Sequence, residues 1–146
     1  MKDMIQREII IKASKERIYE AIANPEQVIL WFPDTIEGDY SVGKHPIFGF
    51  GEQCRNQIYI EDAKPYDYFA YRWIPGASSF FGDVRNVPNT LVEFRISQQS
   101  DNICKVTLTE TGFADLPVEL MATAVEQNAS GWDFMLDRLV NHFEAA

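Results

Sequence analysis

Glu110 is the side chain of this sequence with the clearest potential for chemistry. It follows a run in which Cys104, Val106 and Leu108 alternate with polar residues. Because successive side chains of a strand point to opposite faces, the same alternation places Glu110 on the apolar face, near the end of the strand. A carboxylate there could act as an acid or base, or anchor a polar group of a ligand. Two alternatives remain open: a bulge turns Glu110 to solvent, or a cation such as Arg72 neutralises it.

Other reactive groups are few. His45 and His142 lie far apart in the sequence and show no metal-ligand spacing, so we expect no metal site and no cofactor. There is no nucleophile elbow, phosphate-binding loop or dinucleotide fingerprint. Cys54 and Cys104 lack a C-x-x-C spacing and are interpreted as reduced thiols, although a disulfide stays open. We therefore predict no catalytic residues, and an enzymatic hypothesis would depend on Glu110 alone.

The charge balance limits the kinds of partner. Thirteen Lys and Arg residues against twenty-two Asp and Glu residues give a net charge of −9. Such a surface repels phosphate groups, so we expect neither nucleic-acid nor membrane binding. The sequence has no apolar run long enough to span a membrane and no signal-peptide pattern near Met1, which predicts a cytoplasmic location.

The elements that would position these residues follow one another in the order of an α+β protein. Ile5–Lys12 is a predicted strand, and two short helices follow, the first capped by Ser14 and the second beginning at Asn24-Pro25. Further strands are predicted at Ile36–Ser41, Pro46–Glu52, Cys54–Glu61, Tyr68–Ile74, Thr90–Gln98 and Ile103–Thr111. We interpret residues 1–146 as one domain with helices packed on one face of an antiparallel sheet.

The last thirty residues, Pro117 to Ala146, predict a long amphipathic helix, because apolar residues recur at steps of three and four. Gly131 precedes Trp132 within this helix. A glycine in a helix interior costs about 1 kcal/mol relative to alanine. Its presence predicts that another group approaches the backbone closely at this point.

Several segments are similar to a known family. They are Ile9–Ile22, Asn24–Phe32, Pro65 with Phe69–Trp73, Thr90–Ile96, Val106–Phe113 and Gly131–Leu139. In this order, over some nine-tenths of the chain, they resemble the single-domain bacterial relatives of the activator of heat-shock-protein-90 ATPase, within the START-like (SRPBCC, birch-pollen-allergen-like) superfamily. The resemblance implies a helix-grip fold: a curved antiparallel sheet of about six or seven strands around the C-terminal helix, with a cavity between them. It also implies that Gly131 thins the helix where the sheet curves in and that Trp132 forms part of the cavity wall.

The resemblance favours the binding of a hydrophobic small molecule, lipid-like or aromatic, without catalysis. Superfamily members either bind such molecules, act as enzymes or have no assigned role, and fold alone does not decide between these. The predicted ligand-binding residues are Trp31, Phe32, Phe69, Tyr71, Trp73, Phe94, Glu110, Met121, Val125, Trp132 and Leu136. The alternatives are that these side chains form a solid core, that the protein is a chaperone-activator-like partner of another protein, or that it is a cyclase, dehydratase or hydrolase using Glu110.

One segment departs from a compact hairpin. Residues 75–89 join two strands with more residues than a tight turn needs, and they place Phe80-Phe81 in a loop. Paired exposed aromatic residues often mark contact surfaces. The pair could form a lid, a protein-binding or self-association surface, or a loop that folds back over the sheet.

Overall fold

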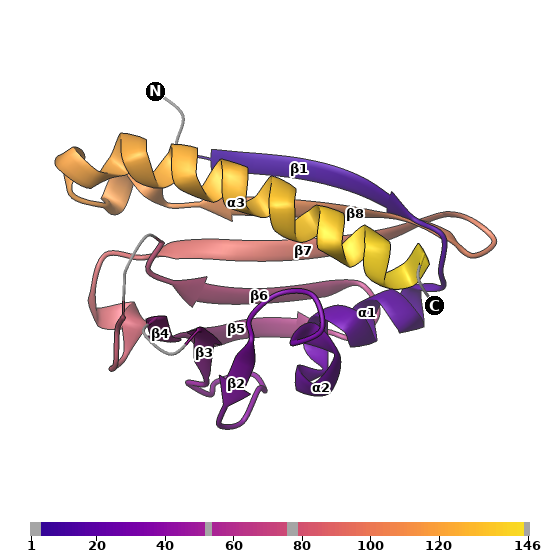
Figure 1. The fold of residues 1–146 in the computed structure, drawn as a ribbon, viewed down its shortest axis with the longest axis horizontal. Helices are drawn as coiled ribbons and strands as arrows, with labels where there is room; N and C mark the ends of the chain where they lie inside the picture. The colour runs from indigo at the N-terminus through magenta and orange to yellow at the C-terminus, as the bar shows by residue number, and fades with distance from the viewer. Residues whose placement is uncertain (1–3, 52–53, 76–78, 145–146) are drawn as a thin grey trace.

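The computed structural model describes residues 4–51, 54–75 and 79–144; within the last range, the side chains of residues 118 and 120–122 are not described. The main elements, in chain order, are β1 (Met4–Ile11), α1 (Lys15–Ala23), α2 (Pro25–Val28), β2 (Thr35–Glu37), β3 (Ile47–Phe50), β4 (Cys54–Gln57), β5 (Tyr59–Lys64), β6 (Tyr68–Trp73), β7 (Thr90–Ser100), β8 (Ile103–Thr111) and α3 (Val118–Glu144). This is the predicted α+β order, and Figure 1 shows α3 lying along the sheet beside β1, β8 and β7.

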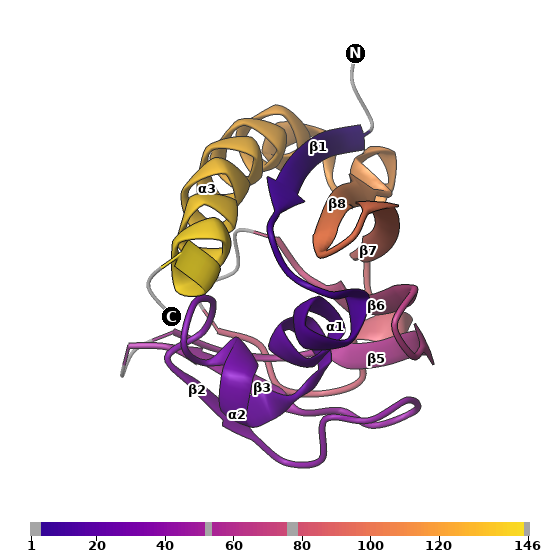
Figure 2. The same ribbon diagram turned by 90° about the vertical axis from the view of Figure 1, so that its right-hand side faces the viewer.

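The strands form two connected antiparallel layers. Five strands pair in the order β1-β8-β7-β6-β5, and β2-β3-β4 form a smaller sheet. Seen from the end, the larger sheet curves around one side of α3 and the smaller sheet continues the curve beneath it (Figure 2). The helix-grip architecture predicted from the family resemblance is confirmed.

The division into two sheets explains where the predicted strands differ from the observed ones. The predicted strand Cys54–Glu61 is split at Ile58, because β4 pairs with β3 whereas β5 pairs with β6. The backbone N–H of Ile58 donates instead to Pro46 O at 2.9 Å. The predicted strand Ile36–Ser41 is reduced to β2 because Gly38 follows with φ of +92°, a conformation that ends the extended run.

The two short helices begin where the sequence predicts and are held by side chains at their ends. At the start of α1, the Ser14 hydroxyl accepts a hydrogen bond from Arg17 N–H. At the start of α2, the side chain of Asn24, the residue before Pro25, accepts a hydrogen bond from Glu26 N–H. The carbonyls at the end of α1 are bonded by more distant aromatic residues: Trp31 Nε1 donates to Ala21 O at 2.8 Å, and the Tyr40 hydroxyl donates to Ile22 O at 3.3 Å. These bonds satisfy groups that a helix end leaves unpaired.

α3 covers the concave face of the larger sheet with a single apolar stripe. Trp132, Leu136 and Leu139 are buried in the common core, and charged residues such as Asp133 and Asp137 are exposed. No helix in the described part of the chain is both long and apolar enough to cross a membrane.

The loop that carries Phe80-Phe81 folds back on the smaller sheet. Phe80 N–H donates to Arg55 O at 3.0 Å, and Gln57 N–H donates to Phe80 O at 2.8 Å, so Phe80 pairs with the edge of β4. Phe81 is 60% exposed. Of the two aromatic residues, only Phe81 offers a large apolar side chain to solvent.

Candidate ligand-binding site

Glu110 is completely buried, with 0% exposure, on the concave face of the sheet. In the register of the strands, Glu110 lies opposite Ile5 of β1 and Val92 of β7, and Val92 lies opposite Tyr71 of β6. No bulge turns the carboxylate to solvent, so this alternative is wrong. Arg72 does not neutralise it either, because the Arg72 guanidinium bonds to the Glu61 carboxylate at 2.6 Å.

Four side chains from three elements donate hydrogen bonds to the Glu110 carboxylate. Trp73 Nε1 and Thr90 Oγ1 bond to Oε2 at 2.9 and 2.6 Å. Trp132 Nε1 bonds to Oε1 at 2.8 Å, and Asn128 Nδ2 reaches both oxygens at 2.9 and 3.0 Å. Trp73 and Thr90 are direct cross-strand neighbours two pairs along from Val92 and therefore lie on the same face of the sheet, which explains why both reach Glu110.

This arrangement matches the hydrogen-bonding capacity of an ionised carboxylate. An ionised carboxylate only accepts hydrogen bonds and has about four lone-pair positions, which these donors fill. Among the described residues, no Lys, Arg or His lies within 4 Å of the carboxylate. Glu110 is therefore held by neutral dipoles and has no free acceptor position for a ligand.

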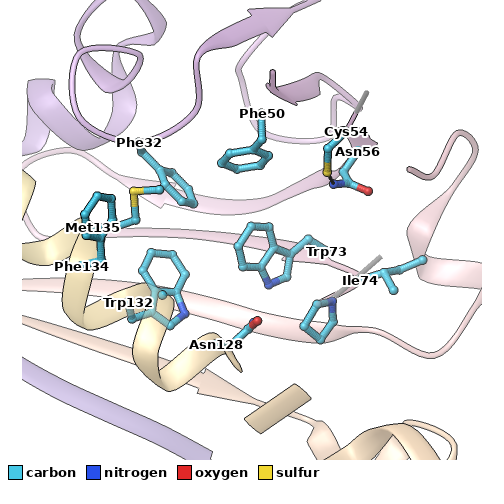
Figure 3. Close-up of a pocket in the computed structure, with 12 residues that line it drawn as sticks. Phe32, Phe50, Cys54, Asn56, Trp73, Ile74, Asn128, Trp132, Phe134 and Met135 are labelled. Carbon is cyan, nitrogen blue, oxygen red and sulfur yellow. Dashed lines mark hydrogen bonds between the residues drawn. The ribbon is translucent and has the colours of Figure 1, made fainter. Parts of the chain in front are cut away.

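A cavity of about 220 Å³ lies directly in front of this cluster, between α3 and strands β3, β4 and β6. Its aromatic walls are Phe32, Phe50, Trp73 and Trp132, drawn together in Figure 3. The Phe32 and Trp132 rings lie 5.1 Å apart between centroids, and the Trp73 and Trp132 rings 5.6 Å apart. The cavity opens to solvent beside Gly131 and Phe134, and the Phe134 side chain is 62% exposed.

The polar groups that face this cavity come from Asn56, Asn128 and Cys54. The nitrogen of Asn128 is committed to Glu110, and Figure 3 shows the side chain reaching from α3 toward Trp73. No described residue donates to the Asn128 oxygen. Asn56 Oδ1 is buried without a hydrogen-bond partner, while its nitrogen lies 3.3 Å from Cys54 Sγ.

The structure divides the predicted ligand-binding residues into three groups. Phe32, Trp73 and Trp132 line the cavity, and Glu110 lies behind the two tryptophans. The buried core outside the cavity lining contains Trp31, Phe69, Tyr71, Phe94 and Leu136, and Val125 is half-buried on α3. The side chain of Met121 lies outside the described part of the chain.

At Gly131 the structure differs from the prediction that another group approaches the helix backbone closely. A Cβ atom built on this residue meets nothing within 4 Å, so no group approaches the helix backbone here and the predicted close packing is wrong. Gly131 is exposed and lines the cavity next to Trp132. The missing side chain leaves open space at the mouth of the cavity.

Sequence reasoning missed Phe50, Asn56, Asn128 and Met135 as lining residues. Asn128 had a detectable signal, because it precedes Trp132 by four residues and therefore lies on the same face of the helix. The sequence contained no comparable signal for Phe50 and Asn56, since their position depends on the smaller sheet folding under α3.

Tyr71 has an unusual environment close to the site. Its hydroxyl is buried without a partner among the described residues. Burial raises the pKa of Tyr71 well above its ordinary value of 10.0, and the neighbouring Tyr40 and the negative charge of Glu110 act in the same direction. Tyr71 contributes to the cavity indirectly, by packing its ring against Trp73 at 5.6 Å between centroids.

Known proteins share this fold over almost the whole chain. DynU16, a putative protein in the dynemicin biosynthetic locus, has a TM-score of 0.77 at 21% identity over 99% of this chain, which spans only 48% of the length of DynU16. The Aha1 dimer from Colwellia psychrerythraea has a TM-score of 0.75 at 18% identity, covering 97% of this chain and 96% of that one. Protein MLL2253 from Mesorhizobium loti has a TM-score of 0.79 at 13% identity, with 98% of both chains covered.

At these identities the solved structures establish the fold alone. No curated protein matches the sequence significantly. The sequence does match a family model described as activator of Hsp90 ATPase homolog 1-like protein, and the match extends over residues 12–144. This chain therefore belongs to the activator of Hsp90 ATPase homolog 1-like family.

Proposed function

We propose that the protein binds a small hydrophobic molecule, without catalysis, in the cavity between α3 and strands β3, β4 and β6. The observation that carries this proposal is the aromatic wall of Phe32, Phe50, Trp73 and Trp132, which faces an open volume rather than a filled core. Burial of apolar ligand surface there is worth about 25 cal/mol per Å².

The size of the cavity restricts the ligand. A volume of about 220 Å³ lies below the range of roughly 300–1,000 Å³ that is typical of drug-sized ligands. An apolar cavity of about 150 Å³ is enough for benzene. The ligand that fits best is a single aromatic ring or a compact aliphatic group with a short substituent, and a long lipid chain would have to extend through the mouth beside Gly131.

The position of Glu110 supports binding over catalysis. A general acid or base must come within hydrogen-bond distance of the group that it protonates or deprotonates. The acceptor positions of Glu110 are occupied, and the indoles of Trp73 and Trp132 lie between its carboxylate and the cavity. Glu110 therefore organises the wall of the site rather than touching the ligand.

Titration of isotope-labelled protein with indole, 2-phenylethanol and p-cresol, followed by NMR, tests this function. We expect saturable shifts of the indole N–H signals of Trp73 and Trp132 and little change for Trp31, which is buried elsewhere. In a Gly131→Leu variant the new side chain would occupy the mouth of the cavity and lower the affinity at least tenfold. Asp137→Leu, on the exposed face of the same helix, is the matched control and should leave affinity unchanged. If none of the compounds binds at millimolar concentration, the proposed function is wrong.

Engagement of a protein partner is the second candidate. Membership in the activator family and the exposed side chain of Phe81 support it. Addition of the protein to a purified chaperone of the heat-shock-protein-90 class, with measurement of its ATPase rate, distinguishes this candidate from ligand binding; an unchanged rate counts against it.

A further inference from the structure

We propose that the preferred ligand of this cavity is an organic cation, meaning a protonated amine attached to a small apolar body. This inference rests on the proposed function, because it assigns a ligand class to the same cavity. It follows from three features: the buried charge behind the aromatic wall, the orientation of the wall, and the polar atom that remains available to a ligand.

The first feature is the uncompensated charge of Glu110. Its carboxylate is fully buried and, among the described residues, has neutral hydrogen-bond donors but no cationic partner within 4 Å. Electrostatic interactions in such an environment are much less weakened by solvent than on the surface. No described residue lining the cavity is a lysine, arginine or histidine, so the site itself supplies no positive charge. A cationic ligand would supply it.

The second feature is the orientation of the two indoles. Trp73 and Trp132 both direct their N–H edges at Glu110 while other parts of the rings line the cavity. The N–H edge is the positive part of an aromatic ring, and the face carries the negative part. Hydrogen bonds to an anion polarise the donor groups further, which adds electron density to the rings. Tryptophan faces are the preferred aromatic partners of ammonium groups.

The third feature is the kind of polar atom left at the cavity. Asn128 uses its nitrogen for Glu110, so its oxygen remains as an acceptor. Asn56 also lines the cavity, but its oxygen is fully buried and is not accessible to a ligand. The Asn128 oxygen accepts hydrogen bonds, which suits a ligand that carries N–H donors. An anionic ligand would meet an acceptor atom and a buried negative charge, which disfavour it.

The test compares three ligands of nearly equal size and different charge: 2-phenylethylamine, 2-phenylethanol and phenylacetate. At pH 7 they are cationic, neutral and anionic. Dissociation constants come from the NMR shifts of the Trp73 and Trp132 indole signals. We expect the amine to bind at least tenfold more tightly than the alcohol, and phenylacetate to bind more weakly than either.

A second comparison identifies the source of the preference. Glu110→Gln removes the charge at nearly constant side-chain size, and we expect it to lower the ratio of amine to alcohol affinity about tenfold. Asp137→Asn removes an exposed charge from α3 and should leave the ratio unchanged. Circular dichroism shows whether the Glu110 variant is folded; if it is not, the wild-type affinity ratio decides the question.

The outcomes separate this inference from the proposed function. If 2-phenylethanol binds and the amine binds no more tightly, the apolar cavity binds ligands but has no preference for cations, and only the present inference is wrong. An unchanged amine-to-alcohol ratio in a folded Glu110→Gln protein also contradicts it. If none of the three compounds binds, both proposals are wrong.

Discussion

At the scale of single residues, the central feature is a carboxylate that acts through its neighbours. Glu110 was identifiable from strand alternation alone, but its role was not. The structure shows it accepting hydrogen bonds from Trp73, Thr90, Asn128 and Trp132, so that one buried charge fixes two walls of the cavity. Removal of any one donor affects both the packing and the electrostatics of the site.

Trp132 allows these two contributions to be separated. Trp132→Ala should lower the free energy of unfolding by about 3–5 kcal/mol, because a buried large side chain is lost and leaves a cavity. Trp132→Phe keeps a ring but removes one donor to Glu110, and hydrogen bonds to charged groups contribute about 1.5–3 kcal/mol. We expect an intermediate loss for the phenylalanine variant in urea unfolding. An effect of Trp132→Ala below 1 kcal/mol would contradict the packing described here.

At the scale of elements, α3 combines packing along one stripe with an opening at one position. Trp132, Leu136 and Leu139 attach it to the sheet, whereas a Cβ atom at Gly131 would meet no atom of another element within 4 Å. The helix therefore carries the cost of an interior glycine without a packing contact that offsets it. This is consistent with a position kept small for access to the cavity.

Gly131→Ala should accordingly stabilise the protein. The helical conformation suits alanine, and no neighbour has to move, so we expect the free energy of unfolding to rise by about 0.5–1 kcal/mol. Thermal and urea unfolding measure the change. Ser130→Ala, at the exposed neighbouring position, is the control and should give a smaller increase. A destabilised Gly131→Ala variant would show that the helix is packed more closely here than the structure indicates.

At the scale of the whole molecule, the curved sheet encloses tyrosines as well as the carboxylate. Tyr71 and Tyr40 are buried between the sheet and the helices. Burial raises the pKa of both hydroxyls above the ordinary value of 10.0, and it is the largest cause in each case. Both groups must stay protonated in the folded protein, whereas in the unfolded chain they ionise near pH 10.

Stability should therefore fall at alkaline pH. Below pH 10 both tyrosines are protonated in the folded and in the unfolded protein, so they cause no pH dependence of stability. Above pH 10 they ionise first in the unfolded chain, which favours unfolding. The free energy of unfolding should decrease by up to about 1.4 kcal/mol per pH unit for each buried tyrosine. Urea unfolding between pH 9 and 11 measures this slope. Tyr71→Phe should make it shallower, and Tyr66→Phe, at an exposed position, should not.

The class of fold, the order of the elements, the amphipathic helix and the inward direction of Glu110 could be predicted from the sequence. These properties depend on local periodicity and capping, which neighbouring residues encode. Other properties became visible only in the folded protein: Trp31 and Phe94 are core residues, Phe50, Asn56 and Asn128 line the cavity, and Gly131 faces open space. The physical reason is that a cavity is the space left between elements distant in sequence: its walls depend on the change of strand partner at Ile58 and on how α3 lies across the sheet.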